Sequence, residues 1–408
     1  MITNPAVFLL STYPISQPRH GGQIRLAQIA SVYLRAGFRV DNLALYQPEA
    51  YSKEQLGERD IALDRHCSAA CWDGEFIEPM ADFLSGAYAA SNLGAWNAIK
   101  ERLPSLIDVI HVEQPWLWPV AKRIAALPGY ENVKLVYGSQ NIEAPLKQAI
   151  LEASNLNTMG AQKMVNAVAK LEQQACQEAD LVIAVSGHDA RQLQAWGALA
   201  VALGENGITP WVATADKLNH WRVRLPCNPW PLYVSSAHLP NYQGFAVPFA
   251  NSLYSLAMQN TQLVVAGGVS PFIKSEFAAT QFPLLNRECL LSLGVLSDSD
   301  LAAVKSLAHA FVLPINAGGG TNIKTAEALY SGAHVIASPM AFRGYEEFLD
   351  MPQVLVANRP AQFHQMLFNC LSMPRSSLNP ADRIRLEKLT WINRLEAIPR
   401  KVMALLES

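Results

Sequence analysis

The chain has 408 residues, half of them hydrophobic, which is enough for roughly two or three domains with sizeable cores. Its 32 Lys and Arg residues nearly balance its 34 Asp and Glu residues, so the formal net charge is −2. Nucleic-acid-binding proteins usually carry a basic excess, so we expect no nucleic-acid partner.

Cysteines are sparse and form no CxxC motif, as is typical of a cytosolic protein with reduced thiols. The apolar run at residues 6–10 is too short for a signal sequence. No apolar stretch approaches the roughly 20 residues that span a bilayer. These observations predict a cytoplasmic protein. The mixture of aromatic and basic side chains at 116–123 leaves peripheral membrane contact open, beside the simpler interpretation of a helix packed on the core.

Short runs rich in Val, Ile and Leu alternate with helical patterns, which indicates parallel sheets covered by helices. In the first half we predict strands at 6–10, 39–45, 108–112, 134–137 and 181–185. A loop rich in Pro and Gly follows the first strand, and a helix at 24–36 ends before Gly37. A long helix is predicted at 143–178.

Residues 209–231 interrupt this alternation with four prolines and three tryptophans, and we place an interdomain linker there. Further strands are predicted at 232–235, 263–267, 311–315 and 334–337. The expected organisation is an N-terminal domain at 1–210, a linker at 211–230, a C-terminal domain at 231–385 and a final segment at 386–408. Residues 391–406 in that segment have the pattern of an amphipathic helix.

The most informative segment, residues 311–329, reads as a strand, a glycine-rich loop and a helix. Three consecutive glycines would let a phosphate approach the backbone. The start of the following helix would direct free N–H groups toward that anion. Lys324 adds a positive charge, and the Glu327 carboxylate can accept hydrogen bonds from both hydroxyls of a ribose. The pattern fits a nucleoside diphosphate, although a glycine-rich turn that only changes the chain direction stays open.

Residues 318–337 resemble the donor-binding segment of family 4 glycosyltransferases of GT-B fold. The resemblance is closest to a subgroup whose segment reads GxGTxxKxxEA. Glu327 matches the glutamate that holds the ribose in that family. The other glutamate of the family segment would fall at Gly319, so that acidic group is absent here. The backbone amides of residues 320–322 are the expected replacement.

The resemblance extends over most of the chain. Residues 18–22, Pro-Arg-His-Gly-Gly, are similar to the family's N-terminal glycine loop, which lies against the donor phosphates or the acceptor. A plain strand-to-helix turn stays open there. The strand that ends in His111 looks like a family strand, and His111 equally suits a hydrogen bond in the core. Gln140 stands where a subgroup pattern has His, and Gln can bond a sugar hydroxyl but cannot act as an acid or base.

Residues 235–244 resemble the subgroup's loop with Pro-Asn and a final Gly. Most of the wider family carries an Arg and a Lys in this loop, which neutralise the leaving diphosphate, and neither occurs here. His238 and Lys324 are the cationic candidates that remain, with Arg19 and Arg343 as possible contributors from other loops.

The resemblance implies an α/β fold with two facing Rossmann-like domains, in which parallel sheets are covered by helices. It places the nucleotide-sugar donor on the C-terminal domain and a glycan, lipid-linked or protein acceptor on the N-terminal domain. The final helix would return to the N-terminal domain. The implied activity is a glycosyltransferase that retains anomeric configuration. The alternative is a GT-B protein that binds a nucleotide or glycan as a partner subunit without catalysis, which the residues at Gly319 and Gln140 favour.

We expect three residues to be catalytic: Lys324, Glu327 and His238. The residues expected to bind the donor or substrate are Gly21, Gly22, Gln140, Asn241, Gly318, Gly319, Gly320, Thr321 and Asn322. No cofactor and no metal ion are expected. Cys67 and Cys71 lack a second ligand pair at zinc spacing. Asp298 and Asp300 precede a helical run, where Asp is a common cap.

Overall fold

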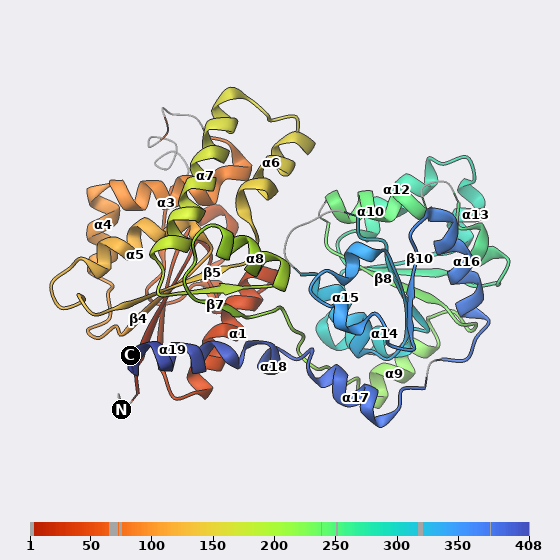
Figure 1. Ribbon diagram of the computed structural model, residues 1–408. Coiled ribbons are helices and arrows are strands. Elements are labelled where there is room, and N and C mark those ends of the chain that lie inside the picture. The colour runs from red at the N-terminus through yellow and green to blue at the C-terminus, as the bar shows by residue number, and fades with distance from the viewer. Residues whose placement is uncertain are drawn as a thin grey trace. The chain divides into compact units, whose positions relative to one another are not determined.

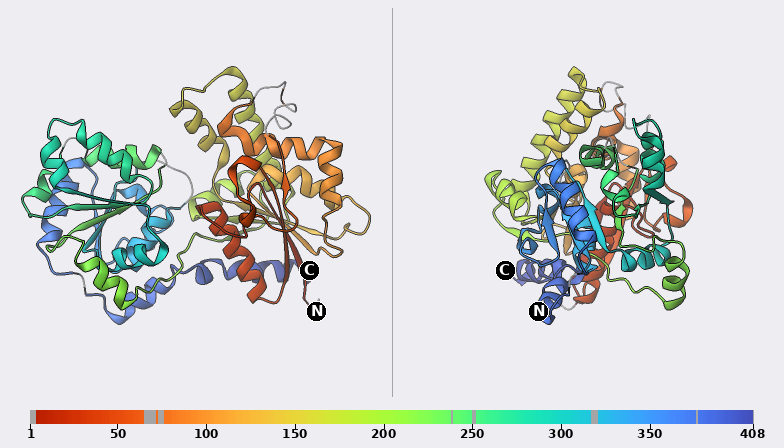
Figure 2. Two further views of the ribbon diagram at one scale, coloured as in Figure 1. Left: turned by 180° about the vertical axis from the view of Figure 1, so that it is seen from behind. Right: turned by 90° about the vertical axis from the view of Figure 1, so that its right-hand side faces the viewer.

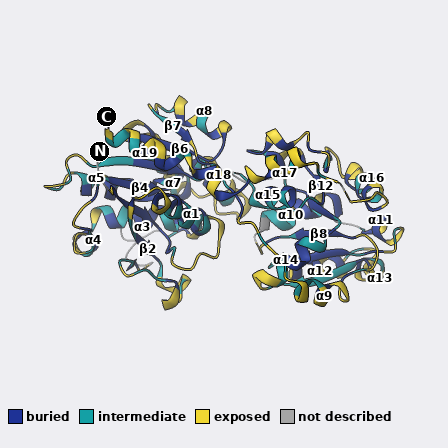
Figure 3. Ribbon diagram, turned by 90° about the horizontal axis from the view of Figure 1, so that it is seen from below, coloured by how far each residue is buried: buried dark blue, intermediate teal, exposed yellow. Residues whose placement is uncertain are grey.

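The computed structural model describes residues 4–64, 72, 76–237, 239–249, 252–316, 321–375 and 377–407. The chain divides into two compact units. The first unit comprises Met1–Asn206 and Arg394–Ser408, and the second comprises Gly207–Asn393. Each unit contains one parallel sheet surrounded by helices (Figure 1). Buried residues concentrate in the strands of each unit, and exposed residues lie on helices and loops (Figure 3).

The sheet of the first unit has seven strands in the order β3-β2-β1-β4-β5-β6-β7. Its strands are β1 (Ala6–Ser11), β2 (Arg39–Tyr46), β3 (Ile61–Ala62), β4 (Val109–Glu113), β5 (Lys134–Ser139), β6 (Leu181–Ala184) and β7 (Val201–Leu203). The strand order reverses between β1 and β4. The loops that leave these two strands therefore diverge at their carboxyl ends, which is where open parallel sheets commonly bind ligands.

The helices of the first unit are α1 (Gly21–Arg35), α3 (Ala81–Ser91), α4 (Leu93–Lys100), α5 (Trp118–Ala125), α6 (Glu143–Ala153), α7 (Met159–Glu178), α8 (Gly187–Ala195) and α19 (Ala397–Glu407). Its short 3₁₀ helices are η1 (Pro48–Ala50), η2 (Lys53–Gln55), η3 (Glu78–Met80) and η4 (Pro115–Leu117). Helix α19 packs against α1 and β7, so the C-terminal residues complete the first unit (Figure 2).

One helix prediction in this unit was wrong. The long helix expected at 143–178 is two helices, α6 and α7. Asn155, between them, has φ of 55°. Asn adopts this left-handed conformation more readily than most residues, and it cannot continue a right-handed helix. The tryptophans Trp116 and Trp118 are buried, so their aromatic rings form core and not a membrane-facing surface.

The sheet of the second unit has six strands in the order β10-β9-β8-β11-β12-β13. Its strands are β8 (Pro231–Val234), β9 (Leu263–Ala266), β10 (Leu290–Gly294), β11 (Ala310–Leu313), β12 (His334–Ala337) and β13 (Val354–Val356). Its order reverses between β8 and β11, so the loops after these two strands diverge in the same way.

The helices of the second unit are α9 (Ala215–Arg222), α10 (Leu239–Phe249), α11 (Tyr254–Ala257), α12 (Ser270–Ala278), α13 (Pro283–Glu288), α14 (Asp298–Leu307), α15 (Ile323–Tyr330), α16 (Pro360–Leu371) and α17 (Pro380–Glu387). Its 3₁₀ helices are η5 (Pro339–Phe342) and η6 (Glu346–Phe348). Helix α18 (Trp391–Leu395) spans the boundary between the units.

The segment expected to be a linker, 211–230, belongs to the second unit and contains α9. Trp221 and Trp230 from this segment are buried in the core of that unit, which gives the tryptophans of the segment a packing role. No helix in the described part of the chain is long and apolar enough to cross a membrane.

Candidate functional site

The first candidate half-site lies on the loops after β1 and β5. The side chain of Gln140 donates a hydrogen bond from Nε2 to the hydroxyl of Tyr13. A Cβ atom at Gly22 would lie 3.1 Å from Gln140 Oε1 and 3.2 Å from the Tyr13 hydroxyl. Gly22 and Gln140, which the sequence suggested separately, therefore meet around Tyr13. Sequence reasoning missed Tyr13, although it lies in the same Pro- and Gly-rich loop.

The loop before Gly21 and Gly22 is held by Gln23, which is fully buried. Gln23 accepts a hydrogen bond from the Arg19 backbone N–H at 2.8 Å and donates one to the Pro14 carbonyl at 2.6 Å. His20 caps α1 and meets the Tyr13 ring edge-on at 5.3 Å. Burial lowers the pKa of His20, with Asp82 opposing, so its ring is neutral at pH 7. The loop thus carries its own buried polar support.

A buried ionic network lies beneath this half-site. Arg25 Nε contacts Glu113 Oε1 at 2.7 Å, and Glu113 Oε2 contacts His111 Nε2 at 3.1 Å. The other ring nitrogen of His111 contacts the Tyr33 hydroxyl at 3.1 Å. Burial opposes the ionisation of Glu113, but Arg25 and His111 outweigh it and hold its pKa at about 2. His111 is completely buried, so of the two interpretations the core hydrogen bond holds.

Two further carboxylates fix the loop that carries Gln140. Glu172 of α7 accepts the backbone N–H groups of Glu143 at 2.7 Å and Ala144 at 2.8 Å, which caps the start of α6. Glu143 Oε1 accepts hydrogen bonds from Gln114 Nε2 at 3.2 Å and Asn141 Nδ2 at 3.3 Å. Burial raises the pKa of Glu143 and raises that of Glu172 to about 8. The loops after β4 and β5 are therefore joined through Glu143.

The second candidate half-site lies at the starts of α10 and α15, the helices that follow β8 and β11. Lys324 Nζ donates to Asn241 Oδ1 at 2.5 Å, which brings together two residues that the sequence had suggested. The Asn241 side chain donates in turn to the Ser236 carbonyl at 3.2 Å. Burial lowers the pKa of Lys324 to about 8, with Glu327 opposing this change. Lys324 is thus charged at pH 7 and held in a defined position.

Helix α10 approaches the carboxyl end of β11 closely at Gly244. A Cβ atom at Gly244 would lie 2.4 Å from the Pro314 carbonyl oxygen, so any side chain there would push α10 away. This contact gives a packing reason for the final glycine of the 235–244 motif. Asn241 lies on the same helix, so the close approach at Gly244 also fixes the position of Asn241.

The start of α15 offers unsatisfied hydrogen-bonding groups. Its N-cap residue, Asn322, makes no side-chain cap bond to the first turn. The Thr321 hydroxyl is buried and has no hydrogen-bond partner among the described residues. Thr325 anchors the helix by donating to the Ala341 carbonyl at 2.6 Å. A buried hydroxyl and the first N–H groups of a helix, which have no acceptor within the helix itself, are suited to an anionic ligand beside Lys324.

Glu327 makes an ion pair that the sequence did not predict. Lys305 Nζ of α14 lies 3.1 Å from Glu327 Oε1, and the Lys305 side chain is 8% exposed against 28% for Glu327. The same ammonium group lies 3.9 Å from the ring centre of Trp211. Glu327 is therefore held by a buried cation while keeping part of its carboxylate accessible.

Four predicted site residues, His238, Gly318, Gly319 and Gly320, lie outside the described residues, as do Cys67 and Cys71. Asp300 accepts hydrogen bonds from Lys217 Nζ at 2.6 Å and Trp221 Nε1 at 3.0 Å. Ser297 caps α14 by accepting the Asp300 backbone N–H. The Asp298/Asp300 pair is thus part of a helix start, as we expected.

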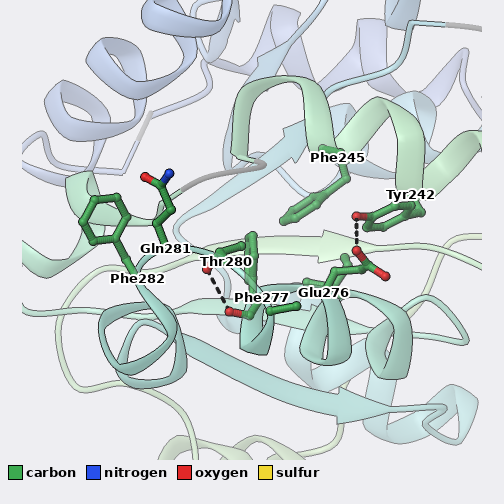
Figure 4. Close-up of a pocket in the computed structure, with 10 residues that line it drawn as sticks. Tyr242, Phe245, Glu276, Phe277, Thr280, Gln281 and Phe282 are labelled. Atoms are coloured by element: carbon green, nitrogen blue, oxygen red, sulfur yellow. Dashed lines mark hydrogen bonds between the residues drawn. The ribbon is translucent and has the colours of Figure 1, made fainter.

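A pocket of about 570 Å³ lies between α10 and α12 of the second unit (Figure 4). Its wall combines the aromatic rings of Tyr242, Phe245 and Phe277 with the carboxylate of Glu276. Tyr242 donates its hydroxyl hydrogen to Glu276 Oε2 at 3.2 Å. No predicted site residue that the structure describes lines this pocket, so it is separate from the half-site around Lys324.

No model of a known protein family matches the sequence, and no curated protein sequence matches it significantly. Solved structures do match over nearly the whole chain. Sucrose-phosphate synthase from Thermosynechococcus elongatus is 16% identical, with a TM-score of 0.67, over 99% of this chain and 98% of that one. The catalytic domain of starch synthase IV from Arabidopsis thaliana, bound to ADP and acarbose, is 13% identical with a TM-score of 0.62, over 99% of both chains.

WaaG, a glycosyltransferase involved in lipopolysaccharide biosynthesis, is 15% identical with a TM-score of 0.60, over 98% of this chain and 99% of that one. These similarities extend over both units and both sheets. The chain therefore has the GT-B fold of these glycosyltransferases, and the predicted fold class is confirmed.

Proposed function

We propose that this protein is a glycosyltransferase that takes a sugar from a nucleotide-sugar donor, with the donor bound by the second unit. The observation that carries the proposal is the bond between Lys324 and Asn241 beside the unpartnered Thr321 hydroxyl at the start of α15. A cation, a buried donor group and free helical N–H groups together recognise a diphosphate. The structural similarity to a starch synthase described as bound to ADP supports the same class of ligand here.

The Glu327 carboxylate fits the ribose of that nucleotide. Its ion pair with Lys305 orients it, and its partial exposure leaves acceptor positions for hydroxyl groups. The asymmetric burial of the pair fits this role, because a carboxylate that was fully enclosed could not reach a ligand.

Transfer would build negative charge on the departing nucleoside diphosphate. Lys324 and the N–H groups of α15 would stabilise that charge by electrostatics, which is often the largest contribution to catalysis. No metal ion is needed for this scheme. Gln140, on the first unit, would orient a sugar hydroxyl by hydrogen bonding, and its bond to Tyr13 holds it in place. Retention of anomeric configuration, and a glycan, lipid-linked or protein acceptor, complete the proposal.

The test begins with thermal shift measurements on a panel of nucleoside diphosphates, because a ligand of the native state raises its melting temperature. The nucleotide that binds then defines the nucleotide sugars for turnover assays, with product configuration read by NMR. Sugar transfer at a rate that does not change when Mg²⁺ or Mn²⁺ is added would support the scheme. Binding without transfer to any acceptor would favour the partner-subunit alternative, and absence of nucleotide binding would overturn the proposal of a glycosyltransferase.

A further inference from the structure

A cluster of potential metal ligands lies at the amino end of the second sheet, away from the half-site around Lys324. His309 immediately precedes β11, His334 begins β12, and Cys370 lies in the last turn of α16. One potential ligand atom from each of the three residues lies within 4.8 Å of the others. The two backbones are joined directly, since the His334 N–H donates to the His309 carbonyl at 3.1 Å. Three separate elements thus converge on one point.

Both imidazole rings are oriented by backbone carbonyl groups. His309 Nε2 bonds the Cys370 carbonyl at 3.0 Å, and His334 Nε2 bonds the Pro374 carbonyl at 3.0 Å. A carbonyl oxygen can only accept, so Nε2 carries the hydrogen in both rings. In a neutral imidazole the other ring nitrogen, Nδ1, keeps a lone pair and can bind a metal ion.

This is the arrangement that metal-ligating histidines usually show. One ring nitrogen binds the metal, and the other donates its N–H group to a backbone carbonyl or carboxylate, which fixes the ring. The two rings lie near each other, with centroids 5.3 Å apart and planes inclined at 46°. This inclination is not that of a stacked pair.

We propose that His309, His334 and Cys370 bind a zinc ion, with a water molecule as the fourth ligand. Zinc favours tetrahedral sites of nitrogen and sulfur, with bonds of about 2.0–2.1 Å to nitrogen and about 2.3 Å to sulfur. The ligand atoms lie within 4.8 Å of one another and would have to draw closer together to meet these lengths. His334 and Cys370 are buried while His309 is half-buried, so the water lies on the side of His309.

Zinc binding changes the protonation of Cys370 without any redox step. The thiol releases its proton to solvent as the zinc–sulfur bond forms, and the two imidazoles bind as neutral ligands. Zinc affinity therefore rises with pH.

One nearby charge opposes a cation. Arg375 lies close enough to His309 to affect its pKa, and its guanidinium donates to the carbonyls of Ser306 at 3.0 Å and Ser331 at 3.2 Å. The thiolate formed on binding offsets one of the two charges of the ion. The site lies at the opposite ends of β11 and β12 from the loop that leads to α15, so it is separate from the half-site around Lys324.

The experiment uses the full chain, stripped with a chelator and returned to metal-free buffer. Zinc is titrated by calorimetry, and cobalt(II) is added separately, because a thiolate bound to cobalt gives a charge-transfer absorption band. All proteins carry Cys227→Ala, since Cys227 is an exposed thiol that could bind metal by itself. We expect one equivalent of zinc and the thiolate band.

The key variant is Cys370→Ala, and Cys289→Ala is its matched control, since Cys289 is another buried thiol of the second unit. We expect Cys370→Ala to lose the cobalt band and at least tenfold in zinc affinity, and Cys289→Ala to keep both. His334→Gln provides a second variant, because its amide N–H can still donate to Pro374 while the second ring nitrogen is gone. Zinc binding and a thiolate band that survive in both Cys370→Ala and His334→Gln would overturn the proposal, as would no zinc binding by the parent protein.

Discussion

Lys305 and Glu327 form an ion pair of 3.1 Å in which the lysine is almost completely buried and the glutamate is partly exposed. Lys305 also lies over the ring of Trp211, whose own ring meets Tyr330 edge-on at 5.5 Å. The cation is thus fixed from two sides. Lys305 is a positioning residue for Glu327, because it orients the carboxylate without itself reaching the proposed ribose.

Replacement of Lys305 by Met should weaken nucleoside diphosphate binding by about 1–2 kcal/mol, the scale of a hydrogen bond to a charged group. Lys305→Arg should recover part of this loss, whereas Glu327→Ala should lose about 1.5–3 kcal/mol by itself. Dissociation constants from calorimetry provide the measurement. Lys217→Met is the control. Lys217 is also a lysine of the second unit that forms an ion pair, but its partner is Asp300 and not Glu327. Equal affinities of wild type and Lys305→Met would remove Lys305 from the site.

Lys324→Ala should lower kcat by roughly a hundredfold or more, the loss that removal of one electrostatic stabiliser commonly causes. Lys324→Arg should restore part of it. A cation that acts on the leaving group affects kcat and not binding alone, so both parameters are needed. The assay measures sugar transfer with the donor and acceptor that the nucleotide screen identifies. A kcat that hardly changes in Lys324→Ala would refute this role.

The pKa of Lys324 adds a pH signature. Because it is lowered to about 8, the charged form is dominant below pH 8 and is lost above it. Turnover that depends on this charge should therefore fall as the pH rises through about 8. The Lys324→Arg variant should lack this fall, since a guanidinium stays protonated. If turnover fell in the same way above pH 8 in wild type and in Lys324→Arg, the fall would come from the titration of another group.

The interior strands could be predicted from the sequence because both of their faces are buried, so they read as continuous apolar runs. The four strands that the sequence did not reveal are β3, β7, β10 and β13, and all four lie at sheet edges. Most of their residues are partly or fully exposed, and three of these strands are no longer than three residues. Such short segments carry little periodicity.

The residues of the candidate site also divide into those that the sequence could predict and those that it could not. Lys324, Asn241, Gly22 and Gln140 could be suggested because each belongs to a local motif after a strand. Lys305 could not, because its meeting with Glu327 depends on how α14 and α15 pack, and no local pattern encodes that packing. Tyr13 was missed for a related reason, since its contact with Gln140 joins residues 127 positions apart.

The buried pair of Arg25 and Glu113 should be essential to the stability of the first unit. Arg25→Met removes the guanidinium that pairs with the buried Glu113 carboxylate and leaves only its contact with His111, which should cost about 3–5 kcal/mol of unfolding free energy. The double variant Arg25→Met/Glu113→Gln should be more stable than Arg25→Met alone, because the buried charge is gone. Urea unfolding at pH 7 measures both. A double variant less stable than Arg25→Met would show that Glu113 makes other interactions of greater weight.

Glu172 should give the protein a pH-dependent stability. It is fully buried, and its pKa in the folded state is about 8, mainly because of burial. An unfolded Glu titrates near about 4.3, so between these values the folded state binds more protons than the unfolded state. The stability contributed by protonated Glu172 is fully present below about pH 4.3 and is lost as the pH rises through about 8. Wild type should therefore lose stability over this interval.

Glu172→Gln removes that titration, while its amide oxygen can still accept the N–H groups at the start of α6. The unfolding free energy of wild type minus that of Glu172→Gln should fall by on the order of 2–4 kcal/mol between pH 5 and pH 8. Glu178→Gln on the same helix is the control. Burial alone would raise the pKa of Glu178, but its bonds to Lys122 and Trp118 outweigh burial and lower it. Glu178 therefore cannot cause a loss of stability as the pH rises over this interval. Urea denaturation at several pH values gives both differences. Parallel stability curves for wild type and Glu172→Gln would mean that Glu172 stays ionised in the core, held by the two backbone N–H groups that it accepts.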